Sequence, residues 1–367
     1  MIKREGMEIN SKLDEEQVNK IAKIVSKKIC DSFEEHNFNE NDIINLFSRI
    51  DMYIAKMPED SAASKYSYKT NTIYLGDNID FNNIDTLVIH ECIHAIQEVK
   101  NNKGKVVKLG LFDLTHNKGQ GINEAAVQLM ASKATKTNVD TVKYYNLDFK
   151  TESPLYYPIE TALINQIIYF IGPYPVFHST IYGDDIFKKT FIAKSSQKVF
   201  EQIERNFDLL IRYEELLGKY SGKMNMKKTN TNKINKILEK INYTKNAIAN
   251  LTLETQNLIL ESCFSCEFNL IKDKDSLNTF QNRLYDFSKI LISNDSYDFY
   301  NKFYCDMMNN LEEKREIIKV HGKITNLNNL QTDLLNIGQE TYGMSFFQKL
   351  FSKLKLLFEN ARIKEKN

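Results

Sequence analysis

Five consecutive residues, His90-Glu91-Cys92-Ile93-His94, have the types and the spacing that support metal-dependent hydrolysis. Residues four apart in an α-helix project from the same face, so both imidazoles would point the same way, one turn apart. Two neutral imidazoles in this arrangement are a pair of ligands for a divalent metal, most often zinc. Glu91 would then lie where it can take a proton from metal-bound water. The pattern therefore predicts hydrolysis of an amide bond.

The residues around this pattern predict a helix over 83–100. One broad face of it is apolar at spacings of three and four, through Leu87, Val88, Cys92, Ala95, Ile96 and Val99. Asn82 or Asn83 can cap its start, and Asp85 suits its first turn. The alternative interpretation is two core histidines bonded to backbone groups, which would leave Glu91 as a buried carboxylate without a purpose.

A catalytic zinc site requires a third protein ligand and leaves the fourth position to water. Glu124 is the strongest candidate, because it lies near the start of a second segment rich in helix formers. Two antiparallel helices would bring this carboxylate to the histidines. His116 and Asp113 are rival ligands in the polar connection 101–121, but a helix holds a ligand more rigidly than a loop does.

With these residues the chain resembles the gluzincins, the thermolysin-like zinc metallopeptidases in the broad sense. That family pairs H-E-x-x-H on one helix with a Glu, often within Asn-Glu-Ala, on the next, and Asn123-Glu124-Ala125 matches the second motif. The resemblance implies a zincin-like catalytic core in which His90, His94 and Glu124 bind Zn²⁺ and Glu91 is the general base. It is carried by these motifs and covers roughly residues 50–190.

Two features depart from the thermolysin-like pattern. The interval between His94 and Glu124 is longer, and Gln128 stands where those enzymes carry an Asp that orients a ligand histidine. A glutamine still accepts an imidazole N–H, but without charge, so the histidine would be a less basic ligand. No metzincin extension follows His94, which excludes that branch.

The tetrahedral oxyanion formed during hydrolysis needs a donor besides the metal. We favour Tyr182 and His178 for this catalytic role. Tyr156 and Tyr157 are further candidates. For each of the four, a packed aromatic ring or a surface side chain is the competing interpretation.

The rest of the chain predicts a mainly α-helical fold with a small β-hairpin or sheet (α+β). Residues 11–60 read as two helices, and 159–170 as another that starts at Pro158. Thr72–Leu75 reads as a strand with 66–68 as its hairpin partner. In zincins such a strand precedes the active-site helix and lines the cleft, where the substrate adds as a further strand.

No proline follows Pro175, which favours long uninterrupted helices toward the C-terminus. We expect an N-terminal helical segment over 1–60, a zincin-like core over 61–217 and a long helical C-terminal region over 233–367. The polar segment 218–232 reads as a linker between the last two.

Composition narrows the functional classes. The net charge is +1, so no global field favours nucleic acid. The start of the chain lacks the apolar run of a signal peptide, and five cysteines indicate a reducing, cytoplasmic setting. Residues 345–358 are amphipathic and basic; they predict either peripheral contact with an anionic membrane or docking of their apolar face onto the protein.

Three functions are consistent with these observations. The first is zinc-dependent hydrolysis of peptide bonds in a peptide or protein substrate. The second is a narrow-specificity toxin or effector peptidase, because such enzymes often carry helical additions. The third is a non-catalytic helical binding protein that keeps a zincin-like scaffold. The presence of bound zinc separates the first two from the third.

Overall fold

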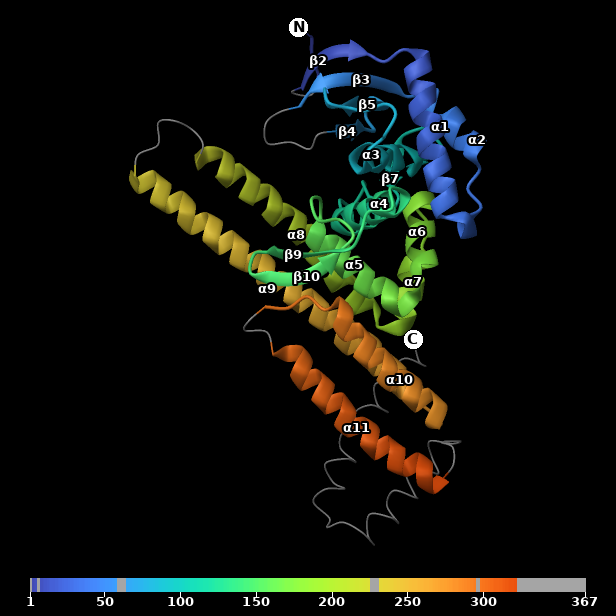
Figure 1. Cartoon of the computed structure of the whole chain (residues 1–367), viewed down its shortest axis with the longest axis vertical. Helices are drawn as coiled ribbons and strands as arrows, with labels where there is room; N and C mark the ends of the chain where they lie inside the picture. The colour runs from blue at the N-terminus through green and yellow to red at the C-terminus, as the bar shows by residue number, and fades with distance from the viewer. Residues whose placement is uncertain (1, 5–6, 58–63, 225–230, 295–297, 322–367) are drawn as a thin grey trace. The chain divides into compact units, whose positions relative to one another are not determined.

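The computed structural model describes residues 2–4, 7–57, 64–224, 231–294 and 298–321 (Figure 1). It is mainly helical with small sheets and a long helical C-terminal region, as the sequence predicts. Contacts divide the chain into two compact units. The first comprises the chain up to Asn269 together with Leu284–Tyr300, and the second comprises 270–283 and the chain from Asn301 onward. The predicted domain boundaries stay a prediction.

A five-stranded sheet stands at the start of the first unit, in the order β1-β2-β3-β5-β4. Its strands are β1 (Ile2–Arg4), β2 (Met7–Lys12), β3 (Asp51–Lys56), β4 (Ser64–Ser67) and β5 (Thr72–Leu75). The predicted hairpin is confirmed as the antiparallel pair β4 and β5. β4 forms an edge of the sheet and lies against the helix that carries the two histidines.

The two helices expected within 11–60 are present as α1 (Glu15–Ser32) and α2 (Glu40–Phe47), with the short 3₁₀ helix η1 (Glu34–His36) between them. The segment is not helical throughout, because β2 and β3 enclose the helices. β3 pairs in parallel with β5 and antiparallel with β2. These partners are distant in sequence, so local periodicity gives no sign of the pairing.

The histidine helix is α3 (Thr86–Ile96), shorter at both ends than expected. Asp85 is its N-cap and accepts a hydrogen bond from the Val88 N–H at 2.9 Å, in place of the expected Asn82 or Asn83. Beyond Gln97 the chain turns into a three-stranded meander of β6 (Glu98–Lys100), β7 (Val106–Leu109) and β8 (Phe112–Asp113). The connection to the next helix therefore has its own β structure.

Glu124 lies in α4 (Gln120–Ala134), and the expected helix after Pro158 is confirmed as α5 (Pro158–Ile171). α4 packs against α3 on one side and against α5 and α8 (Gln197–Met224) on others (Figure 1). The remaining elements here are the hairpin β9 (Asp140–Tyr144) and β10 (Leu147–Thr151), and the helices α6 (Pro173–Tyr182) and α7 (Ile186–Lys194).

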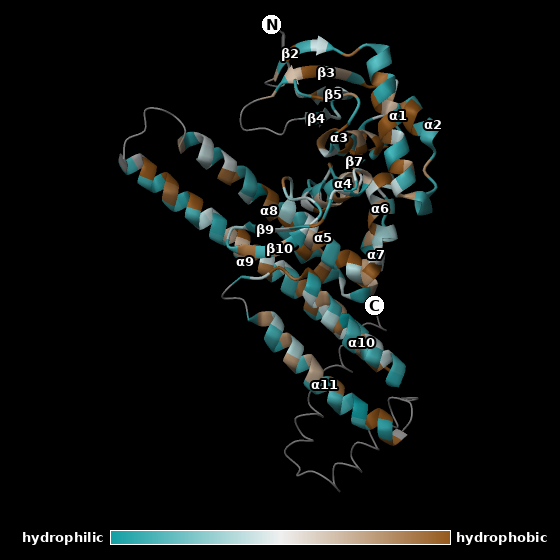
Figure 2. Ribbon diagram, viewed as in Figure 1, coloured by the Kyte–Doolittle hydropathy of each residue, from teal (hydrophilic) through white to brown (hydrophobic). Residues whose placement is uncertain are grey.

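α8 and α9 (Thr231–Asn269) form a long helical pair. Both alternate between apolar and polar residues along their length (Figure 2), which is typical of amphipathic helices. The prediction of a linker over 218–232 is wrong for its first part, because α8 continues to Met224. Tyr220 is held there by Lys240 of α9, whose ammonium lies 5.6 Å from the ring centre.

The helices that follow are α10 (Lys274–Phe287), η2 (Ser288–Ile290) and α11 (Phe299–His321). Within the described ranges, no helix combines the length and the apolar character needed to cross a bilayer. The amphipathic segment 345–358 lies outside the described residues. The five cysteines are not joined by disulfides, and Cys92 is fully buried in α3, consistent with its place on the predicted apolar face.

Candidate metal centre

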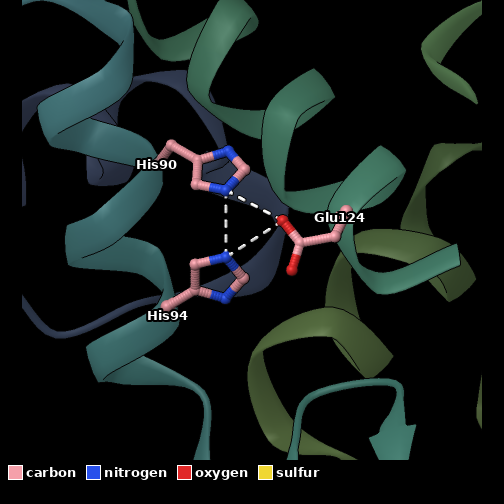
Figure 3. Close-up of side chains that lie close together, drawn as sticks. All are labelled: His90, His94 and Glu124. Carbon is pink, nitrogen blue, oxygen red and sulfur yellow. Dashed lines mark hydrogen bonds and ion pairs between the residues drawn. The ribbon is translucent and has the colours of Figure 1, made fainter. Parts of the chain in front are cut away.

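Three predicted ligands converge from two helices (Figure 3). His90 Nε2 and His94 Nε2 of α3 lie 3.2 Å and 3.4 Å from Glu124 Oε2 of α4, and the two nitrogens lie 2.9 Å apart. The histidines are buried and Glu124 is nearly so. Among the described residues, this is the group of histidine, cysteine and carboxylate side chains whose ligand atoms come close enough to hold a metal ion.

The spacing of these donor atoms fits a zinc ion. Tetrahedral coordination with bonds of about 2.0–2.1 Å would separate the ligand atoms by roughly 3.3 Å. Two imidazole nitrogens with facing lone pairs repel each other unless a cation or a proton lies between them. Without metal, burial lowers the pKa of His94, but the Glu124 carboxylate outweighs it and raises that pKa to about 9. A metal ion would therefore displace a proton here.

The outer nitrogen of each imidazole is held by an amide. His90 Nδ1 lies 2.9 Å from Gln128 Oε1, and His94 Nδ1 lies 2.6 Å from Gln97 Oε1. An amide oxygen only accepts, so Nδ1 carries a proton in both rings, and Nε2 is the nitrogen left to face Glu124 and to bind a metal once any proton there is displaced. Both histidines are thus set in the tautomer that binds a metal through Nε2.

Sequence reasoning missed Gln97, which is fully buried. Its Oε1 also accepts from Asn123 Nδ2 at 3.1 Å, and its Nε2 donates to Asn123 Oδ1 at 3.0 Å and to the Thr180 carbonyl of α6 at 2.8 Å. Gly110 makes room for this network, since a Cβ there would lie 2.2 Å from Gln97 Nε2. Asn123, noted only as part of a motif, therefore supports His94 through Gln97.

Gln128 connects His90 to the loop before α5. Its Nε2 donates to Ser153 Oγ at 2.9 Å, and that hydroxyl in turn donates to the Tyr156 carbonyl at 2.5 Å. The residue that stands in place of the family's Asp thus makes the expected contact with a ligand histidine. It also fixes the loop that leads into Tyr157.

α4 is held in place from α8. Asp208 accepts from the N–H groups of Gly119 at 3.0 Å and Gly121 at 2.8 Å, which are free donors at the start of α4. A Cβ on Gly121 would lie 2.3 Å from the Phe207 carbonyl, so the two helices approach as closely as glycine allows. This contact sets the position of the first turn, from which Glu124 projects.

Glu91, the predicted general base, is buried with 8% of its surface exposed. Its Oε2 accepts a 2.6 Å hydrogen bond from the Tyr66 backbone N–H in β4. That N–H belongs to the sheet edge facing α3 rather than to the ladder with β5. The carboxylate therefore lies between the ligand helix and the edge strand.

Tyr157 lies closer to the ligands than the favoured donors do. Its ring stacks on that of His90, with centroids 6.0 Å apart and planes 20° apart. The neighbouring Glu124 carboxylate, together with burial, raises the pKa of its phenol well above the usual value, so the hydroxyl keeps its proton. Its backbone is left-handed (φ 48°), at the position just before Pro158, and turns the ring toward α3.

His178 and Tyr182 lie in α6 and contact other aromatic rings. His178 Nδ1 is 2.9 Å from Asp184 Oδ2, and its ring lies 4.6 Å from that of Tyr182, which is half exposed. Their catalytic role stays a prediction. The rival ligands His116 and Asp113 pair with each other at 2.8 Å and do not belong to the group around Glu124.

No protein-family model, curated protein or solved structure matches this chain. The likeness to gluzincins is therefore carried by the site residues themselves.

Proposed function

We propose that this protein is a zinc-dependent peptidase of the gluzincin type. The observation that carries the proposal is the convergence of two Nε2 atoms and one carboxylate, with both Nδ1 atoms held by amide oxygens. Second partners of this kind are typical of metal-binding histidines, since they fix the ring and its tautomer. A structural pair of core histidines would not need both outer nitrogens anchored and both inner ones turned to one carboxylate.

Each residue then has a chemical part in the reaction. When bound, zinc lowers the pKa of a coordinated water and polarises the scissile carbonyl. Glu91 is next to a ligand in sequence and accepts the proton, which it passes to the leaving amine. The phenol of Tyr157, protonated and stacked on His90, is our first choice for the donor to the oxyanion, ahead of Tyr182 and His178.

The proposed substrate is a peptide or protein in extended form. β4 is an edge strand, and the Tyr66 N–H on its outer side is bonded to Glu91. A substrate strand added along this edge would compete for that N–H and would release the Glu91 carboxylate for proton transfer. Binding of the substrate strand would then free the Glu91 carboxylate in the same step.

Metal analysis of the purified full-length protein is the first test. We expect one equivalent of zinc in the wild type and its loss in His94→Ala, with His116→Ala as the matched control that keeps zinc. Absence of zinc after reconstitution would favour the non-catalytic binding protein instead.

Peptide-library cleavage is the second test. Glu91→Gln should keep zinc and lose hydrolysis by about 10²–10⁴-fold, because the amide cannot take the proton. Full activity of this variant would contradict the assigned role of Glu91. Cleavage confined to one protein substrate would identify the narrow-specificity form of the same function.

A further inference from the structure

His36 is a buried histidine far from the metal ligands in sequence, with 6% of its surface exposed. Its ring lies between two aromatic rings and nearly parallel to both. The centroid of Phe38 is 5.3 Å away with an angle of 8°, and that of Tyr174 is 4.8 Å away with an angle of 3°. Since Tyr174 belongs to α6, the imidazole joins η1 to that helix.

Neither ring nitrogen of His36 has a hydrogen-bond partner. The nearest acceptor is Glu35 Oε1, 3.4 Å from Nε2 and outside hydrogen-bond geometry. Buried polar atoms are usually paired, so two unpaired nitrogens on one buried ring need an explanation. A neutral imidazole tolerates this position at moderate cost, whereas an imidazolium would bury a charge with no partner at Nδ1 and only the 3.4 Å approach of Glu35 at Nε2.

The other titratable groups that face His36 come from η1 and α6. Glu35 belongs to η1, while His178, Tyr174 and Tyr182 belong to α6. The His178 ring lies 6.1 Å from the His36 ring, and its Nδ1 is paired with Asp184 just beyond α6. A positive charge on His36 would therefore be placed beside a second imidazole, with Glu35 as the one carboxylate that faces it from η1.

We propose that His36 is an acid-sensitive latch, which holds η1 against α6 when its ring is neutral and releases α6 when it is protonated. The latch consists of His36 with Phe38 from the N-terminal helical segment, and of Tyr174 and His178 from α6. The ring contacts of His178 and Tyr182 with Tyr174 and Phe38 belong to the same docking surface.

The direction of the pH effect follows from burial. Burial lowers the pKa of His36 below its usual 6.5; the Glu35 carboxylate opposes this shift and His178 adds to it. The docked form thus binds fewer protons than the undocked form. Docking is then fully stable above pH 6.5 and weakens as the pH falls below that value.

Release of α6 would affect the candidate metal centre through two hydrogen bonds. The Thr180 carbonyl of α6 accepts from Gln97, and Gln97 holds the Nδ1 proton of His94. Through this path the latch would regulate hydrolysis, and that part of the inference rests on the proposed function. The latch itself does not, so we test it on the metal-free protein.

Hydrogen exchange of the full-length, metal-free protein at pH 7.5 and pH 5.0, corrected for intrinsic rates, measures the docking directly. In the wild type we expect the amides of 33–38 and 173–182 to lose protection at pH 5.0, while those of β5 keep it. In His36→Phe, which keeps an aromatic ring but cannot be protonated, both segments should stay protected. His116→Ala, which removes an exposed histidine, should respond as the wild type does.

Two outcomes would overturn the latch. One is unchanged protection of 33–38 and 173–182 in the wild type at pH 5.0. The other is an equal loss in His36→Phe, which would assign the acid response to another group. If His36→Phe does not fold at pH 7.5 by near-ultraviolet circular dichroism, His36→Gln takes its place as the variant without charge and is judged by the same two outcomes.

Discussion

Amide side chains, rather than carboxylates, orient the two ligand histidines. The Oε1 atoms of Gln97 and Gln128 each accept a hydrogen bond from an Nδ1–H, and their Nε2 atoms donate to Asn123 and Ser153, respectively. His90 and His94 could be predicted from their helical spacing, and Glu124 from its place near the start of a second helix, because a metal site needs such side chains. Gln97 could not, since it lies in no motif and acquires its role only when α3, α4 and α6 are packed together.

The amide at position 128 gives a prediction about metal affinity. Gln128→Met keeps the volume but removes the acceptor, so we expect zinc binding to weaken by about 10–100-fold, measured by competition with a chromogenic chelator. Gln128→Glu restores an acceptor and should bind zinc at least as tightly as the wild type. Gln197→Met, on the exposed start of α8, is the control. If Gln128→Met bound zinc as tightly as Gln128→Glu and Gln197→Met do, the contact between Gln128 and His90 would be unimportant for metal binding.

The choice between Tyr157 and the two α6 residues can be decided by kinetics. Tyr157→Phe should keep the ring against His90 and lose the hydroxyl, lowering kcat by about 10²–10³-fold with little change in zinc content. Tyr182→Phe and His178→Phe should leave kcat close to that of the wild type. A large loss in either of these, with an active Tyr157→Phe, would restore the assignment made from sequence.

Individual elements were predicted best where one local signal was sufficient. Pro158 at the start of α5 and the hairpin of β4 and β5 are such cases. The extent of α3 was overestimated, because its apolar spacing continues past Ile96 although Glu98–Lys100 pairs with β7. β2 was missed although one of its partners, β1, adjoins it in sequence, and β3 was missed since both of its partners are distant. Local patterns carry no record of such pairing.

The close approach of α4 to α8 predicts an effect of one methyl group. Gly121→Ala would place a Cβ 2.3 Å from the Phe207 carbonyl, so the helices must separate. We expect a loss of about 1–3 kcal/mol in stability and weaker zinc binding, because Asp208 loses its contact with the start of α4. Denaturant unfolding and the chelator competition measure the two effects.

Gly218→Ala is the matched control within α8. It meets nothing within 4 Å and should gain about 0.5–1 kcal/mol, the usual advantage of alanine in a helix. If Gly121→Ala were as stable as Gly218→Ala, the tight packing between α4 and α8 would be contradicted.

For the whole molecule, the class of fold was predictable from the sequence, but the presence of buried carboxyl groups that keep their protons was not. Glu160 of α5 is fully buried, and both of its carboxyl oxygens lack a hydrogen-bond partner. Burial and the nearby Glu214 of α8 raise its pKa well above the usual value, and burial raises the pKa of Glu214 to about 7. Such a pair exists only once α5 and α8 have both packed against α4, so composition cannot reveal it.

Glu160 and Glu214 together make the stability of the folded protein fall as the pH rises. The folded state holds protons on Glu160 and Glu214 that the unfolded state gives up near pH 4.5. Their contribution to stability is therefore complete below that value and is lost as the pH rises through about 7. Glu214→Gln should flatten the fall in Tm between pH 5 and pH 7, measured by circular dichroism. An equally steep fall in that variant would mean that another group titrates.

The cap on α4 has a consequence for how the protein is made. Asp208 comes 87 residues after Gly121, the N–H donor that it holds. While the ribosome is still translating α5, α6 and α7, the helix bearing Glu124 has no partner for its free amides. The proposed metal site is therefore expected to be completed late in synthesis, after α8 has emerged from the exit tunnel.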